Sequence, residues 1–365
     1  MRPGKLYSII FLYLVIIFTL YLASSLKKKN AAHVLKGQRD YIFAFFITII
    51  AAYFIGMRPL RGGFGDSFYY AHTFNLYAIG IKDDVGASEW LWAKFTEICA
   101  RTMDVHMYFT IIASVYFGFT FWACKRLFPN NVLVALFFNF AAFSFFSYSV
   151  NGLRNGAACS IILFVLALAS GGNKEKIIAL VIGFYAMAIH KSTILPYAMM
   201  IASMFFVKNF KWAYTFWLVS IIVSFVAGGY LENLFMGLGY DDRLDSYLSG
   251  ADEYAAAGYK SGFRWDFLLY SMMPIVLGYY VVIKRGIQDK TYLLLLNTYT
   301  LSNAIWVMLI RASYSNRFAY LSWFMYPMVL AYPLLRLDVW GKDQGKNAAR
   351  IMLAHVGFTW FMSLI

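Results

Sequence analysis

The chain of 365 residues is 61% hydrophobic and only 14% charged, and its mean hydropathy is +0.60. A soluble protein of this size could not cover so much apolar surface, so the composition predicts an integral membrane protein that crosses the bilayer many times. Its three cysteines, Cys99, Cys124 and Cys159, have neither the spacing of a disulfide framework nor that of a zinc site.

The apolar segments predict an all-α bundle of transmembrane helices. A helix needs about 20 apolar residues to cross roughly 30 Å of hydrocarbon. The last segment is short, so we predict 11 or 12 spans that form a single membrane domain over residues 1–365. The predicted spans are 6–26, 41–57, 107–123, 131–150, 156–170, 177–190, 193–207, 212–231, 266–283, 291–310, 318–335 and 351–365.

The first apolar run follows Arg2 and Lys5 and therefore resembles a signal peptide. However, no small-residue cleavage site precedes Lys27, Lys28 and Lys29, which are typical of a stop-transfer flank. We expect this first span to be retained.

Lysine and arginine are concentrated in alternate loops, which predicts the orientation. With the N-terminus outside, the inner loops hold 18 of the 32 basic residues but only five of the 18 acidic ones, as the preference for positive inner loops requires. This asymmetry accounts for nearly all of the net charge of +14. A nucleic-acid-binding surface is not needed to explain the charge, and we expect no nucleic-acid partner.

Two loops on the predicted outer face are long, about 58–106 and 232–265, whereas the inner loops are short. The chemistry is therefore expected outside. The sequence contains no Walker-type phosphate loop, no dinucleotide-binding glycine pattern and no HExxH motif. We expect a reaction without ATP, cofactor or metal.

Several basic residues stand at the predicted outer ends of spans, against the usual charge preference. The planar guanidinium binds phosphate with two parallel hydrogen bonds, so this group suggests an anionic headgroup such as a lipid-linked pyrophosphate. Alternatively, each side chain snorkels or stabilises a helix C-terminus. The candidate phosphate ligands are Arg58, Arg61, Arg154, Lys191, Arg264, Arg311 and Arg317.

Three acidic or imidazole side chains are candidate catalytic residues. Asp66 follows a glycine-rich stretch and begins a short aromatic helix, either as an N-cap or as a general base that takes a proton from a sugar hydroxyl. His190 ends a span at the level of Arg154, where it could bind phosphate, act as a general acid, or simply cap the helix. Asp266 enters span nine beside Arg264, and these two charges could instead pair only with each other.

Amide and aromatic side chains near these charges could contact sugar. The second outer loop mixes tyrosines with carboxylates, which suits a hydroxyl-rich ligand, although a solvated acidic loop is the alternative. The candidate sugar contacts are Tyr69, Asn151, Asn155, Tyr247 and Tyr254.

The order of these motifs resembles the EpsG family, which are Wzy-like polysaccharide polymerases of bacterial envelopes. The resemblance runs over roughly residues 40–335 and depends on order and spacing more than on any one match. It is carried by the Asp66-to-Tyr69 element, NGLRNGAA at 151–158, AIHKSTILP at 188–196, SGFRWDFLLYSMMP at 261–274 and YSNRFAYLSWFMYP at 314–327.

The resemblance implies a membrane fold like that of the glycosyltransferase C class. It also implies an undecaprenyl-pyrophosphate-linked oligosaccharide substrate, used without a nucleotide sugar on the outer face of the bacterial cytoplasmic membrane. Arg154, His190, Arg264, Asp266 and Arg317 fall on the family's motifs. The family usually has Gln after the first of these arginines, and this chain has Asn. A chain-length regulator and a flippase are expected partners.

Three other functions are compatible with parts of this pattern. An O-antigen-type ligase would use the same donor and the same arginines. A flippase for lipid-linked oligosaccharide should show internal repeats and charges in the middle of its spans, whereas this chain places its charges at span ends. A membrane acyltransferase would need a His and Asp pair that the outer loops do not show.

The predicted orientation can be tested by labelling. Single cysteines placed at Ser88 and Ser249 in a cysteine-free background should react with a membrane-impermeant thiol reagent applied to intact cells, because both lie in outer loops. A cysteine at Asn173 lies in an inner loop and should not react. Equal labelling at all three positions would contradict the orientation.

Overall fold

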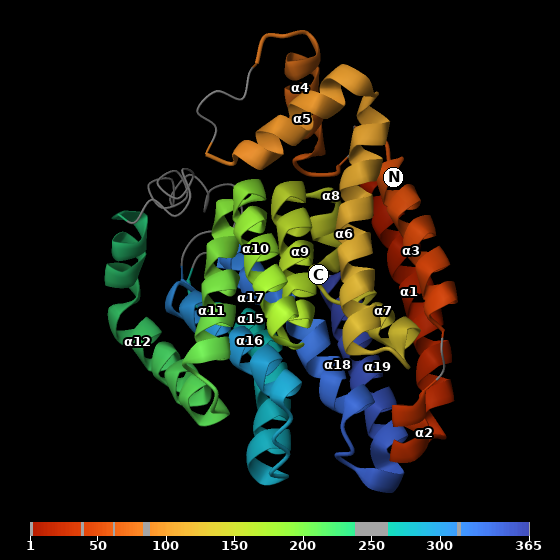
Figure 1. Cartoon of the computed structure of the whole chain (residues 1–365), viewed down its shortest axis with the longest axis vertical. Helices are drawn as coiled ribbons and strands as arrows, with labels where there is room; N and C mark the ends of the chain where they lie inside the picture. The colour runs from red at the N-terminus through yellow and green to blue at the C-terminus, as the bar shows by residue number, and fades with distance from the viewer. Residues whose placement is uncertain are drawn as a thin grey trace. The chain divides into compact units, whose positions relative to one another are not determined.

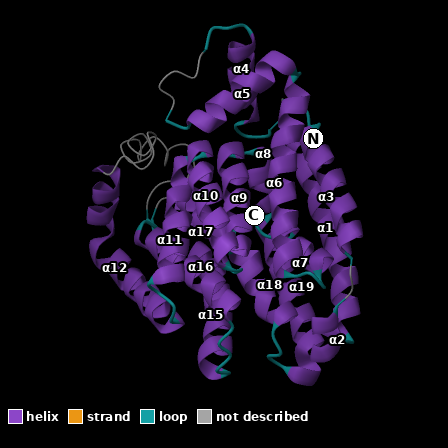
Figure 2. Cartoon of the chain, in the orientation of Figure 1, coloured by secondary structure: helices purple, strands orange, loops and turns teal. Residues whose placement is uncertain are grey.

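The computed structural model describes residues 3–37, 40–60, 63–82, 88–237, 262–311 and 315–364, with the backbone alone at 228, 229, 231–237 and 315. Every regular element in these ranges is a helix, which confirms the all-α prediction (Figure 2). The chain forms two compact units. Unit 1 comprises Met1–His190 and Ala331–Ile365, and unit 2 comprises Lys191–Leu330.

Unit 1 contains the long helices of the first half of the chain and the C-terminal helix. Its helices are α1 (Pro3–Lys27), α2 (Ala31–Lys36), α3 (Tyr41–Gly56), α4 (Ser67–Ala78), α5 (Trp90–Thr102), α6 (Val105–Leu127), α7 (Val132–Phe140), α8 (Phe145–Val150), α9 (Leu153–Ala169), α10 (Asn173–Ile189), η3 (Gly341–Asp343) and α19 (Gln344–Met362). Helix α6 packs against both α3 and α9, and α9 packs against α10.

Unit 2 is built around α16, which packs against α11, α12, α15 and α17. Its elements are η1 (Lys191–Thr193), α11 (Ile194–Phe205), α12 (Phe210–Gly237), α15 (Trp265–Gly278), the π-helical η2 (Tyr279–Lys284), α16 (Lys290–Met308) and α17 (Ser315–Trp323). The boundary with unit 1 falls inside α18 (Tyr326–Arg336).

Each predicted span coincides with a helix or with consecutive helices. Five described segments are long and apolar enough to cross a membrane, which supports a multi-pass membrane protein. They are Pro3–Lys27, Val105–Leu127, Phe210–Ala227, Trp265–Lys284 and Asn316–Arg336, and the shorter helices α3 and α9 are apolar as well. The number of 11 or 12 crossings stays a prediction.

The predicted continuous span at 131–150 is wrong in one respect, because the structure divides it into α7 and α8. A break inside hydrocarbon frees backbone carbonyls that must find other donors. Helix α19 supplies them: the His355 Nε2 lies 2.9 Å from the carbonyl of Phe138, and the Thr359 hydroxyl donates to the carbonyl of Ala141 over 2.6 Å. The side chains of α19 therefore make the break tolerable.

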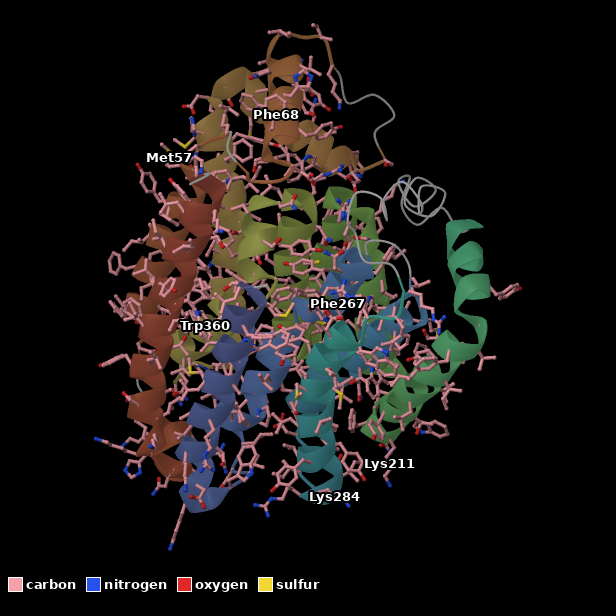
Figure 3. The ribbon with its side chains drawn as sticks, turned by 180° about the vertical axis from the view of Figure 1, so that it is seen from behind. Met57, Phe68, Lys211, Phe267, Lys284 and Trp360 are labelled. Carbon is pink, nitrogen blue, oxygen red and sulfur yellow. The ribbon has the colours of Figure 1, made fainter. Side chains whose placement is uncertain are left out.

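The two ends of unit 1 differ in character. Helices α4 and α5 lie together beyond one end of α3, α6, α9 and α10, whereas α2 lies at the other end (Figure 1). Met57 and Phe68 belong to the first of these ends (Figure 3). The second end carries the ion pair of Arg126 with Glu175, at 2.5 Å, in loops predicted to face inward.

In unit 2, too, lysines of predicted inner loops lie at one end. Lys211 and Lys284 lie at one end of this unit, and Phe267, at the start of α15, lies away from them (Figure 3). Both lysines belong to loops that were predicted to face inward. This arrangement is consistent with the predicted orientation, which stays a prediction.

The bonding between α19 and the broken helix leads to a stability prediction. Thr359→Val keeps the shape of the side chain but removes the donor to the Ala141 carbonyl, so it should destabilise the protein by about 1–3 kcal/mol. Thermal unfolding in detergent measures the loss. Ser363→Ala is the control, because the Ser363 hydroxyl donates to the Trp360 carbonyl at an exposed position. An unfolding temperature that is the same for both variants would contradict this role.

Candidate functional site

The first long loop contains a folded helical pair rather than irregular chain. Tyr70 of α4 meets Trp92 of α5 with ring centroids 5.8 Å apart, and Phe74 lies 5.0 Å from Tyr108 at the start of α6. These rings belong to one buried cluster that also includes Leu153 of α9. The pair α4–α5 is therefore fixed over the ends of α6 and α9 by a core of its own.

Arg58 lies inside this end of unit 1 and is fully buried. Its guanidinium donates to the carbonyl of Ile55 and to the hydroxyl of Ser67, both over 2.8 Å, and stands 4.6 Å from the ring centroid of Phe109. Burial lowers the pKa of Arg58 to about 10, so the side chain remains charged at neutral pH. Because no surface of the side chain is exposed, the geometry favours a structural role over the predicted contact with pyrophosphate.

Arg58 helps to fix the start of α4 to the end of α8. The Ser67 hydroxyl, which accepts from Arg58, also donates a hydrogen bond to the carbonyl of Val150 over 2.8 Å. Next to it, the backbone N–H of Asp66 donates to the side-chain oxygen of Asn151 over 3.0 Å. Gly65 has a φ of +56°, and a Cβ there would lie 2.4 Å from the Asn151 side chain, so this close approach requires glycine.

A carboxylate joins the ends of three helices at this place. One oxygen of Glu89, at the start of α5, lies 2.5 Å from the Nδ1 of His190 at the end of α10. Its other oxygen accepts a hydrogen bond from the guanidinium of Arg154, near the start of α9. All three side chains are less than a quarter exposed. We call Glu89, Arg154 and His190 the Glu89 cluster.

Tyr70 lies within electrostatic reach of Arg154 in the Glu89 cluster, and Asp66 lies within electrostatic reach of Tyr70. Burial raises the pKa of Tyr70, the charge of Arg154 lowers it, and the charge of Asp66 raises it. The guanidinium of Arg154 also stands 6.0 Å from the centroid of the Tyr70 ring. A neutral hydroxyl, a guanidinium, an imidazole and two carboxylates are thus gathered at one end of unit 1.

Asp66 occupies the N-cap position of α4, but its side chain makes no capping hydrogen bond. Within the described part of the chain, its carboxylate takes part in no hydrogen bond or ion pair that would explain it. The structure therefore does not support capping as the reason for an aspartate here, and its role as a base stays a prediction.

In unit 2, Arg264 and Asp266 pair with each other. The guanidinium donates to both carboxylate oxygens, over 2.9 and 2.6 Å, and covers the Phe267 ring at 3.6 Å from its centroid. Arg311 is exposed beside the rings of Phe225 and Phe263, at 5.6 and 5.9 Å. The purely structural alternative for the Arg264–Asp266 pair is therefore consistent with the geometry.

The remaining predicted site residues fall into three groups. Asn155 is buried and accepts a hydrogen bond from Cys159, and Asn151 is engaged with Asp66, whereas Tyr69 is exposed. Lys191 lies in η1, and Arg317 is half-buried in α17. Arg61, Tyr247 and Tyr254 lie outside the described residues. A convergence of the unit 2 arginines with Arg154 stays a prediction.

Sequence reasoning missed Glu89, the centre of the cluster. A partly buried arginine and histidine require a nearby carboxylate, and this requirement could have prompted a search for an acidic partner of Arg154 and His190. The first long loop, however, offers Asp83, Asp84, Glu89, Glu97 and Asp104 in addition to Asp66. The partners of Glu89 are 65 and 101 residues away, so the choice among these acids needed the fold. Among the described residues, no three His, Cys, Asp or Glu side chains are grouped as metal ligands would be.

Comparison with known proteins identifies a family. The model of the EpsG family matches residues 41–340, which include every described residue of the cluster. No curated protein and no solved structure matches the chain significantly.

The burial of Arg58 generates a prediction. Arg58→Ala removes both hydrogen bonds and leaves a cavity between the rings, so it should lower stability by about 2–4 kcal/mol. Arg101→Ala is the matched control, because the Arg101 side chain is 69% exposed and pairs with Glu97 on its own helix. Thermal unfolding should separate the two variants clearly. If they unfold at the same temperature, Arg58 does not hold this end of unit 1 together.

Proposed function

The chain belongs to the EpsG family, membership of which implies a role in exopolysaccharide biosynthesis, and from that premise we propose that it is a polysaccharide polymerase. Its substrate would be an oligosaccharide repeat unit linked to undecaprenyl pyrophosphate. The reaction would take place on the outer face of the bacterial cytoplasmic membrane and would need no nucleotide sugar.

The proposed reaction makes three demands on the protein. A hydroxyl oxygen of the incoming repeat unit attacks the anomeric carbon of the growing chain, and the bond from that carbon to the pyrophosphate oxygen breaks. The leaving pyrophosphate carries the electron pair away, so negative charge must be stabilised there. The attacking hydroxyl must also lose its proton to a base.

The observation that carries the proposal is the placement of Arg154. It lies in the first turn of α9, a 17-residue helix whose N-terminal end favours an anion. One guanidinium nitrogen bonds Glu89, while its Nε is buried without a hydrogen-bond partner among the described atoms. A buried unpaired donor is costly, so a phosphate oxygen that reached it would be bound favourably.

The other predicted residues are assigned supporting roles. Within unit 2, Arg264, Arg311, Arg317 and Lys191 remain candidate phosphate ligands, and Asp266 would orient Arg264 through its two hydrogen bonds. The exposed ring of Tyr69 is the best placed of the described sugar contacts because it faces away from the core.

The test is chain extension by purified protein. Wild-type protein should convert a synthetic lipid-linked repeat unit into a ladder of longer products. Arg154→Lys keeps the charge but loses the planar fork, so the rate of extension should fall by about 10²-fold or more.

Arg126→Lys is the control for this experiment. Arg126 is also half-buried and also pairs with a glutamate, Glu175, but it lies in the last turn of α6, whereas the Glu89 cluster lies near the first turn of that helix. This variant should extend chains at nearly the wild-type rate. Full activity of Arg154→Lys would remove Arg154 from the phosphate site. Single transfer to a different acceptor, with no ladder, would indicate a ligase.

A further inference from the structure

We propose that Glu89 and His190 act together as the proton acceptor of the reaction, with His190 as the base and Glu89 as its positioning residue. The inference rests on the proposed polymerisation and names the group that takes the proton of the attacking hydroxyl. Neither the family match nor the motifs of the sequence point to Glu89.

The contact between the two side chains defines which ring nitrogen can act. An ionised carboxylate only accepts hydrogen bonds, so the Nδ1 of His190, 2.5 Å from Glu89, must carry a proton. The neutral imidazole then has its lone pair on Nε2, which is the nitrogen that can accept a proton. This is the arrangement by which a carboxylate orients a catalytic histidine in hydrolases of unrelated fold.

The pair is held from both sides. His190 ends α10, where its own backbone N–H still bonds the Ala186 carbonyl and its extended φ and ψ turn the chain out of the helix. Glu89 is 13% exposed and is anchored through its second oxygen by Arg154. Two side chains fixed by hydrogen bonds and partial burial need little reorganisation before they react.

The alternative base, Asp66, lacks such support. Its carboxylate takes part in no hydrogen bond or ion pair within the described residues that would hold it in one orientation. A base that is itself oriented by a third group is the usual arrangement in activated sites. The geometry therefore favours His190 as the base and leaves Asp66 as a ligand for the hydroxyls of the incoming sugar.

Proton capture at His190 also helps the leaving group. Before reaction, the positive charge of Arg154 is balanced by Glu89, and a neutral His190 adds nothing. When His190 takes the proton, the three side chains gain one positive charge at the moment when the pyrophosphate gains negative charge. Stabilisation that appears only as charge develops accelerates the reaction rather than merely tightening binding.

The proton and the electrons are accounted for in one step. The hydroxyl oxygen forms its bond to the anomeric carbon while the hydroxyl proton moves to Nε2 of His190. The bond between the anomeric carbon and the pyrophosphate oxygen breaks, and its electron pair leaves with the pyrophosphate. The imidazolium, stabilised by Glu89, then returns its proton to water before the next cycle.

A double-mutant cycle tests the pairing through kcat and KM for chain extension. His190→Gln should lower kcat by about 10²–10⁴-fold, which is the usual contribution of a general base. Glu89→Gln should lower kcat by at least about 10-fold without raising KM for the lipid-linked donor, because it frees Arg154. The double variant should be no slower than His190→Gln alone, because Glu89 acts through His190.

Chemical rescue provides the second measurement. Imidazole added to His190→Ala should restore part of the lost rate, because the side chain is partly exposed and its removal opens the site. Asp66→Asn removes a proposed sugar ligand, so it should raise KM for the acceptor and lower kcat less than His190→Gln does. All variants are first compared with wild type by thermal unfolding, so that loss of fold is recognised.

The outcomes separate this inference from the function on which it rests. A wild-type protein that builds no ladder overturns both. If the wild-type protein builds a ladder but the kcat losses of Glu89→Gln and His190→Gln multiply in the double variant, only the proposed pairing of Glu89 with His190 is overturned. A large kcat loss in Asp66→Asn, with no imidazole rescue of His190→Ala, would assign the proton to Asp66 instead.

Discussion

The carboxylate of Glu89 is bonded at both oxygens to helices other than its own, and the geometry of one end of unit 1 depends on these two contacts. Arg154 and His190 lie at the ends of α9 and α10, and α5 brings Glu89 between them. Without the carboxylate, a largely buried guanidinium would have lost its counter-charge, which is costly in a low dielectric. With it, three helix ends are joined and an imidazole is oriented.

The same constraint of satisfying polar groups away from water shapes the rest of the fold. His355 and Thr359 bond the carbonyls exposed where α7 ends. In unit 2, the buried Asn303 accepts from the indole of Trp217 and donates to the hydroxyl of Ser322, so that α12, α16 and α17 are connected. Broken and polar helices persist inside an apolar bundle because neighbouring side chains supply the missing partners.

Hydropathy predicted where helices lie because the length of an apolar run is a local property. It could not show that 131–150 is interrupted, since residues 141–144 contain neither proline nor glycine and the break depends on donors more than 200 residues later. It also missed helix α5, which is too short for a span and is fixed by a ring of α6. Arg154 and His190 were placed at one level by the spans, but the carboxylate between them required three-dimensional contacts.

Arg58 and Arg154, two of the described arginines at this end of unit 1, show why charge preference alone does not identify a site. Both Arg58 and Arg154 oppose the rule for positive inner loops, and both are candidates by sequence. Arg58 lies against aromatic rings with carbonyl and hydroxyl partners, so phosphate could reach it only if the core opened. Arg154 is partly exposed and pairs with a carboxylate, and phosphate oxygens accept the same kind of hydrogen bond from a guanidinium. An arginine already bonded to one oxyanion at a surface can bind another with little rearrangement, and the proposed role of Arg154 as a phosphate ligand depends on this property.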